Sequence, residues 1–231
     1  MPATKRRPRK AGSTLKLPAK TAAQKARAKK IYADLLKLYP DAHCELDYRS
    51  PHELLIATIL SAQCTDVAVN KATPALFKAF PTPAAFTRAT PHQIEPYVKS
   101  LGFFRNKAKS VHGAMSAIIE QFRGEVPRTM DELLTLPGVA RKTANVVLGN
   151  AHHINEGVVV DTHVIRLSGR FGLSRHSDPK KIELDLMALF PQETWTMLSH
   201  LLIWHGRRVC KARNALCSEN AVCRKYCSNA K

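Results

Sequence analysis

Hydrophobic residues recur at helical spacing in almost every segment of this chain. From Ile31 to Leu202, apolar side chains follow one another at intervals of three and four residues, and prolines and glycine-containing turns divide them into segments of ordinary helix length. Only Val158–Val160 has the pattern of an extended segment. The sequence therefore predicts an all-α protein, and 231 residues with 45% hydrophobic content suffice for one large or two small cores.

Residues 136–150, LPGVARKTANVVLGN, contain a tight turn followed by a helix. Pro137 ends the preceding helical pattern, and Gly138 can adopt a positive φ without steric cost, so that neighbouring backbone N–H groups point outward together. The helix that begins near Arg141 presents the positive end of its dipole at the same place. The turn at Gly138, Val139 and Ala140 is therefore predicted to bind a phosphate group.

Lys142 and Asp161 place reactive groups beside this turn. The dipole in a first helical turn favours the neutral amine of Lys142, a nucleophile able to attack a sugar C1′ and form a Schiff base. Asp161 precedes Thr162 as a predicted helix cap, and its carboxylate is able to stabilise an oxocarbenium-like centre or move protons. Singly, each has a simpler interpretation, a solvated lysine and a cap; together they favour cleavage of a glycosidic bond.

Four of the six cysteines lie close together as Cys210, Cys217, Cys223 and Cys227. The reducing interior of a cell disfavours disulfides, so the spacing C-x6-C-x5-C-x3-C indicates metal ligation. The first two gaps are wider than the C-x2–4-C pairs typical of structural zinc. Because four thiolates serve both zinc and iron–sulfur clusters, the spacing alone leaves the two open.

LPGVARKTAN and VVVDTH resemble the helix-hairpin-helix region of the endonuclease III family of DNA glycosylases. The blocks SPHELLIATILSAQCTDVAVNKATPALF, GFFRNKAKSV, GEVPRTMDELLTLPGV and HGRRVCKARNALC follow in the family's order. This resemblance implies a bifunctional glycosylase and AP lyase, which removes oxidised pyrimidines from duplex DNA and nicks abasic sites by β-elimination. Lys142 would be its nucleophile and Asp161 its electrostatic and proton-transfer partner.

Two alternatives remain beside this reading. A non-catalytic helix-hairpin-helix DNA-binding protein would need neither Lys142 nor Asp161. A mismatch-specific glycosylase of the same superfamily would share the aspartate, although the adenine mismatch enzymes generally lack this lysine and carry a further C-terminal domain.

The resemblance also implies a monomer of two helical domains with a DNA cleft between them. Residues 44–154 would form a six-helix barrel containing the hairpin, and residues 19–43 with 155–231 would form an iron–sulfur domain. A [4Fe-4S] cluster held by the four cysteines would present a basic loop to DNA phosphates, formed by Lys211, Arg213, Arg224 and Lys225; a solvated basic face is the simpler interpretation of that loop.

Gln63 and Phe103 occupy the positions that fill the gap left by a flipped nucleotide in the family. Phe103 stands where a leucine wedge is usual; without the resemblance, an ordinary core aromatic would be expected. Ala140 replaces a hairpin glycine, and Cys64 replaces a small apolar residue beside Gln63. In the cysteine loop, Asn220 and Tyr226 stand at the family's third and fourth ligand positions, and Cys223 and Cys227 are expected to replace them.

Positive charge is concentrated at the amino terminus. The formal net charge is +18, and residues 1–30 hold eleven lysines and arginines and no acid, which favours a polyanionic partner. Residues 1–18 are predicted to be a disordered arm that holds DNA non-specifically, the alternatives being a solubility tail or a nuclear or organellar address. We expect no membrane association and a cytoplasmic, nucleoid-associated protein.

Deleting residues 1–18 is expected to weaken binding to undamaged duplex DNA and to flatten its salt dependence. Each lost phosphate contact lowers the slope of log K against log salt by about 0.9. Fluorescence anisotropy titrations at several salt concentrations measure this slope, and an unchanged slope would show that the arm does not touch DNA.

Overall fold

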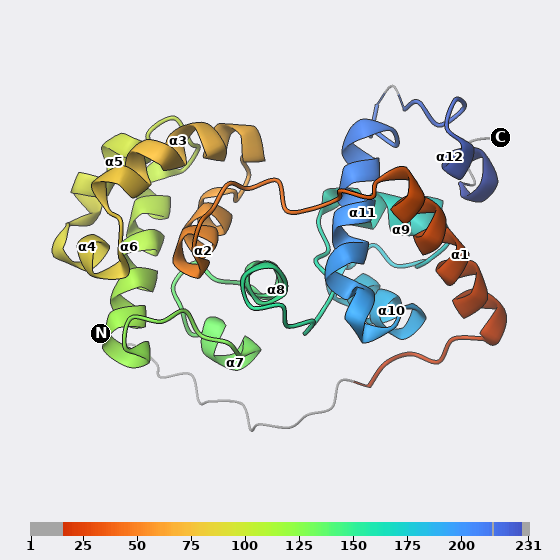
Figure 1. Cartoon of the computed structure of the whole chain (residues 1–231), viewed down its shortest axis with the longest axis horizontal. Helices are drawn as coiled ribbons and strands as arrows, with labels where there is room; N and C mark the ends of the chain where they lie inside the picture. Colours follow the sequence, from red (N-terminus) through yellow and green to blue (C-terminus); the bar gives the residue numbers. More distant parts are fainter. Residues whose placement is uncertain (1–15, 214, 228–231) are drawn as a thin grey trace.

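The computed structural model describes residues 16–213 and 215–227, which form helices joined by loops (Figure 1), and this confirms the predicted all-α class. None of the helices in this part of the chain is long and apolar enough to cross a membrane. Most of the predicted basic arm lies outside the described residues; Lys16–Pro18 lie beside His176 and Lys181. The helices are α1 Ala22–Leu38, α2 Pro51–Leu60, α3 Asp66–Ala79, α4 Pro83–Arg88, α5 Pro91–Val98, α6 Phe104–Phe122, α7 Met130–Leu133, α8 Arg141–Ala151, α9 Thr162–Arg170, α10 Pro179–Leu189, the 3-10 helix η1 Gln192–Thr194, α11 Trp195–Arg208 and α12 Ala221–Tyr226.

Short polar side chains set where many of these helices begin. Thr21 caps α1 through a reciprocal contact with Gln24, and proline occupies the first turn of several other helices, where its missing N–H costs nothing. A side-chain oxygen of the preceding residue accepts a backbone N–H at the starts of α2, α3, α4, α7, α9, α10 and α12, from Ser50, Thr65, Thr82, Thr129, Asp161, Asp178 and Asn220.

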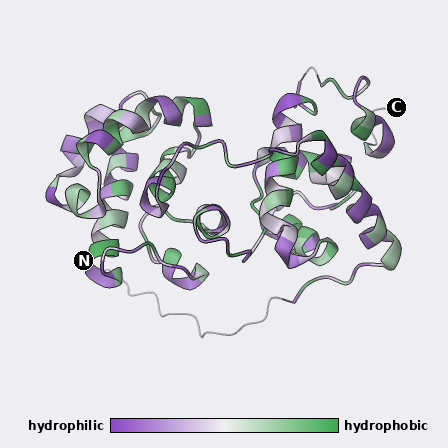
Figure 2. Cartoon of the chain, in the orientation of Figure 1, coloured by the Kyte–Doolittle hydropathy of each residue, from purple (hydrophilic) through white to green (hydrophobic). Residues whose placement is uncertain are grey.

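The buried apolar side chains form two separate cores. One runs from Leu46 to Leu148 and is enclosed by α2 to α8; we call this part the barrel lobe. The other joins residues 28–42 with residues 158–227, and we call it the cysteine lobe. Figure 1 shows α8 between the two groups of helices, and Figure 2 shows hydrophobic and hydrophilic residues alternating along the helices of both.

A buried carboxylate joins the two lobes. Glu183, on α10, accepts hydrogen bonds from Arg141 Nε and Asn145 Nδ2 of α8, both at 2.8 Å. Its side chain is almost fully buried, so these two donors supply the partners that a buried carboxylate requires. The helix that carries Lys142 is thereby held against the cysteine lobe.

Gly149→Ala is expected to destabilise the protein, because α8 and α11 approach closely at this residue. A Cβ at Gly149 would collide with the side chain of Thr196. Overpacking of this kind lowers the free energy of unfolding by about 1–3 kcal/mol, which urea denaturation measures.

Gly169→Ala is the matched control within α9, where an added Cβ has nothing within 4 Å among the described atoms. Helix propensity alone then predicts a gain of up to about 1 kcal/mol. Equal effects of the two substitutions would contradict the close packing at Gly149.

Candidate active site and metal centre

The turn between α7 and α8 exposes backbone donors at the start of a helix. Gly138 has φ +77°, and a Cβ there would lie 2.8 Å from Ser110 Cβ, so glycine is required on both counts. Val139 N–H closes the turn onto Leu136 O. Ala140 is the N-cap of α8, and its methyl side chain offers no acceptor to the first N–H groups of the helix. These donors are therefore available to an anion at the surface.

Lys142 and Asp161 line one cavity from opposite lobes. Lys142 lies in the first turn of α8 with an exposed side chain, whereas Asp161 is half-buried at the start of α9. Asp161 Oδ1 accepts the Val164 N–H at 2.8 Å, which confirms its predicted capping role. The cavity is completed by side chains of the connector between α1 and α2, of α2, α3, α8 and α11, and of neighbouring loops: His43, Cys44, Glu45, Leu46, Thr58, Ser61, Asp66, Val146, Asn150, Val159, Thr196, Ser199, His200, Ile203, Trp204 and Arg207.

Burial disfavours the charged form of two histidines near this cavity. Burial lowers the pKa of His200 to about 4, and its Nε2 hydrogen-bonds Asn150 Oδ1 at 2.8 Å. Burial likewise lowers the pKa of His163, against the opposing charge of Asp161. Besides these histidines, the ionisable side chains around the cavity include Lys142, Asp161, Glu45, Asp66 and Arg207.

Gln63 and Phe103 both occupy strained turns at the surface. Their φ angles are +55° and +57°, in the left-handed region that residues other than glycine rarely adopt. Phe103 is 66% exposed, so the simpler interpretation of a core aromatic is wrong. Cys64, next to Gln63, packs against the barrel core, and Lys107 Nζ lies 3.0 Å from its sulfur. The two turns are thereby tied together at their bases.

Three of the four clustered cysteines meet in a buried site. The Sγ atoms of Cys210, Cys217 and Cys223 lie within 4.8 Å of one another. Cys227 is also buried and belongs to the same core. Asn220 caps α12 by accepting the N–H groups of Val222 and Cys223, which orients the helix that brings Cys223 to the site. The structure thus supplies a thiol cluster able to bind a metal.

The surroundings of this site favour the thiolate form of Cys210, whereas burial and the neighbouring thiols raise the pKa of Cys217 and of Cys223. Hydrogen bonding from Cys223 and from Arg170, whose Nη1 lies 3.0 Å from Cys210 Sγ, lowers the pKa of Cys210 to about 5. His205 Nε2 lies 3.1 Å from Cys223 Sγ, and its Nδ1 lies 3.0 Å from the Tyr39 hydroxyl. Donors aimed at ligand sulfurs are typical of the surroundings of iron–sulfur clusters.

The four cations of the predicted basic loop differ in how they are held. Lys211 and Arg213 are exposed. Arg224 donates to Ser218 O, and Lys225 Nζ forms an ion pair with Asp34 at 2.7 Å. The hydrogen bonds of Asp34 with Lys225 and Tyr226 lower the pKa of this carboxyl. Lys211 and Arg213 therefore present the less constrained charges.

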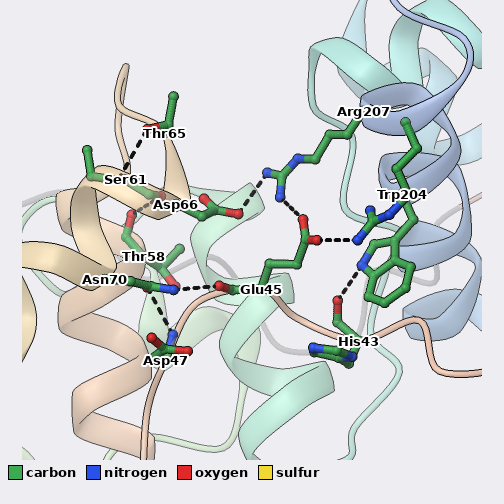
Figure 3. A network of polar contacts seen from close by, with 12 residues as sticks. His43, Glu45, Asp47, Thr58, Ser61, Thr65, Asp66, Asn70, Trp204 and Arg207 are labelled. Atoms are coloured by element: carbon green, nitrogen blue, oxygen red, sulfur yellow. Dashed lines mark hydrogen bonds and ion pairs between the residues drawn. The ribbon is translucent and has the colours of Figure 1, made fainter.

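The polar contacts between the lobes could not be predicted from the sequence. Glu45, Asp66 and Arg207 come from the connector between α1 and α2, from α3 and from α11, yet they form one network at the cavity (Figure 3). Glu183 belongs to no motif either. Asp66 and Arg207 lie in the motif blocks SAQCTDV and HGRRVC, but neither block predicts that their side chains meet.

Comparison with known proteins identifies relatives over most of the chain. The model of the HhH-GPD superfamily of base excision DNA repair proteins matches residues 56–192. Endonuclease III of Synechocystis sp. is 58% identical over 200 residues, which cover 87% of this chain and 91% of that protein. Endonuclease III of Escherichia coli K12 is 39% identical over 193 residues, covering 84% and 91%.

Solved structures agree with these relatives. A trapped endonuclease III–DNA covalent intermediate superimposes with a TM-score of 0.84 at 41% identity, covering 89% of this chain and 96% of that one. A non-covalent endonuclease III–DNA complex gives a TM-score of 0.85 at the same identity and coverage.

Proposed function

The chain belongs to the endonuclease III family of base excision repair glycosylases, and we propose that Lys142 and Asp161 carry out its chemistry on damaged duplex DNA. The observation that carries this proposal is their placement on opposite lobes of one cavity. The substrates are oxidised pyrimidines and abasic sites, and the reaction couples base removal to strand cleavage. A chromosomal substrate also accounts for the cytoplasmic, nucleoid-associated location expected from the sequence.

Base removal begins with the neutral Lys142 amine. Nζ attacks C1′ of the flipped nucleoside, the C1′–N bond breaks, and the base leaves with that electron pair and takes up a proton. The Asp161 carboxylate stabilises positive charge that develops on the sugar and accepts or returns protons. Ring opening gives a Schiff base between Nζ and C1′. Loss of a proton from C2′ then expels the 3′ phosphate, which is β-elimination.

The exposed turns supply the DNA contacts in this proposal. The turn at Gly138, Val139 and Ala140 holds a phosphate beside the uncapped start of α8, whose first N–H groups are available as donors. Gln63 fills the space left by the flipped nucleotide, and the exposed Phe103 wedges between bases. The basic loop binds phosphates along the duplex through Lys211, Arg213, Arg224 and Lys225.

We further propose that Cys210, Cys217, Cys223 and Cys227 hold a [4Fe-4S] cluster. The convergent sulfurs of Cys210, Cys217 and Cys223, the Arg170 donor on Cys210 and the contact of His205 with Cys223 support this assignment. When bound, the cluster supplies a rigid structural centre for the C-terminal segment. The two cores also support a division into domains at residues 44–154 and at 19–43 with 155–231.

Lys142→Ala is expected to abolish borohydride trapping on an abasic duplex while DNA affinity changes less than about threefold, because the hairpin donors belong to the backbone. Gel electrophoresis measures the trapped complex, and anisotropy titration measures the DNA affinity. Trapping by the alanine variant at the wild-type level would place the nucleophile elsewhere.

Asp161→Asn keeps a capping oxygen, so it should slow turnover in a folded protein.

The anaerobically purified protein is expected to be yellow-brown, with about four irons per chain. Cys223→Ser should lose the colour, the iron and thermal stability, because a buried ligand is lost. Cys44→Ser, outside the thiol cluster, is the control and should retain iron. Metal analysis that finds one zinc and no iron would reject the cluster and leave the glycosylase assignment intact.

A further inference from the structure

The connector between α1 and α2 is fastened to both lobes (Figure 3). On the cysteine lobe, Trp204 Nε1 donates to His43 O at 3.0 Å, and Arg208 Nη2 binds Glu45 Oε1 at 2.8 Å. On the barrel lobe, Asn70 Nδ2 donates to Glu45 O at 2.8 Å while its Oδ1 accepts the Asp47 N–H at 3.0 Å. The connector therefore behaves as a strap between α3 and α11.

Arg207 binds the two sides at once. Its Nη1 donates to Glu45 Oε2, and its Nη2 lies 2.7 Å from Asp66 Oδ2. Burial opposes the charges of Arg207 and Glu45, yet their mutual contact, with Asp66 and Arg208, raises the pKa of Arg207 and lowers that of Glu45. A planar guanidinium is suited to hold two carboxylates in fixed directions, which an ammonium cannot do.

We call Glu45, Asp66 and Arg207 the clamp. Both of its ends lie close to residues of the proposed active site. Asp66 lies in the first turn of α3, three residues after Gln63. Arg207 follows Gly206, where a Cβ would lie 2.8 Å from His163 Cβ, so α11 packs tightly on the helix that Asp161 begins. Contacts thus run from the turn that carries Gln63, through Asp66 and Arg207, to α11 and Asp161. All three clamp residues also line the cavity of Lys142.

Stability is a weak reason for such a contact. The three side chains keep 20–31% of their surface exposed, and ion pairs in contact with water contribute little to folding. Their fixed geometry matters more, because small errors in the placement of reacting groups cost large factors in rate.

We propose that Arg207, by holding Glu45 and Asp66 together, is a positioning residue that sets the separation at which Lys142 and Asp161 face the same nucleotide. This inference rests on the proposed function, since it assigns the geometry that the lysine reaction requires. Arg207 acts through the positions of α3 and α11 and does not itself touch the reacting atoms.

The test compares full-length Arg207→Lys and Asp66→Asn with the wild type. Each retains a polar side chain of similar size but cannot maintain the two-carboxylate grip. With enzyme in saturating excess over an abasic duplex, we expect the single-turnover trapping rate to fall about tenfold or more. The Kd for undamaged duplex should change less than about threefold, because the hairpin and basic loop are intact.

Asp34→Asn is the matched control, since it removes an ion pair with Lys225 inside the cysteine lobe. It should leave the trapping rate within about twofold of wild type. The double variant Asp66→Asn/Arg207→Lys should be no slower than the slower single variant, because both changes break one contact.

Two results would overturn the inference: trapping rates within about twofold of wild type in both single variants, or a rate loss that only follows equal losses of thermal stability and DNA affinity. The wild-type and Lys142→Ala proteins are assayed in parallel. If the wild type does not trap, or traps without Lys142, the proposed function fails, and this result is distinguishable from failure of the clamp.

Discussion

The buried carboxylate of Glu183 is the contact on which the cleft depends. A carboxylate removed from water must be paired, and its partners Arg141 and Asn145 both belong to the helix that carries Lys142. The requirement extends to the backbone, since a Cβ at Gly157 would collide with Glu183 and Asn145. A larger residue in this segment between α8 and α9 would force the buried contact of Glu183 with Asn145 to shift. That segment leads directly to Asp161, so one buried charge constrains the approach to both proposed catalytic residues.

Local patterns predicted the helices well because their determinants are local. The Pro137–Gly138 turn locates the start of α8, and the capping residue Asp161 locates the start of α9. The extended pattern of Val158–Val160 does not correspond to a strand. This segment is a buried coil in which Val159 N–H donates to Ser199 Oγ at 3.0 Å. The run of β-branched apolar residues therefore indicates burial on both sides of the segment. The partner of its backbone N–H, Ser199, is distant in the sequence and could not be predicted from the run itself.

The placement of the candidate site residues was predictable to the extent that these residues lie in short motifs. Lys142 and Asp161 follow from such motifs, and so does the grouping of Cys210 and Cys217 with Cys223. The exposure of Phe103 agrees with the wedge position that the resemblance implies, whereas the residues alone would favour a core aromatic. Side-chain contacts between residues far apart in the sequence, such as those of Glu183 with Arg141 and of Arg207 with Glu45, could not be predicted either.

The polar contacts between the lobes follow a common physical logic. Two apolar cores pack well internally, but the hydrophobic effect is non-directional and leaves their relative placement weakly specified. Charged hydrogen bonds add little net stability when partly exposed, yet they are strongly directional. Glu183 holds the Lys142 helix on one side of the cleft, and Arg207 holds the connector and α3 on the other. These directional contacts fix the separation of the two lobes, which the apolar cores alone would leave free. A reaction whose groups come from both lobes requires such a constraint.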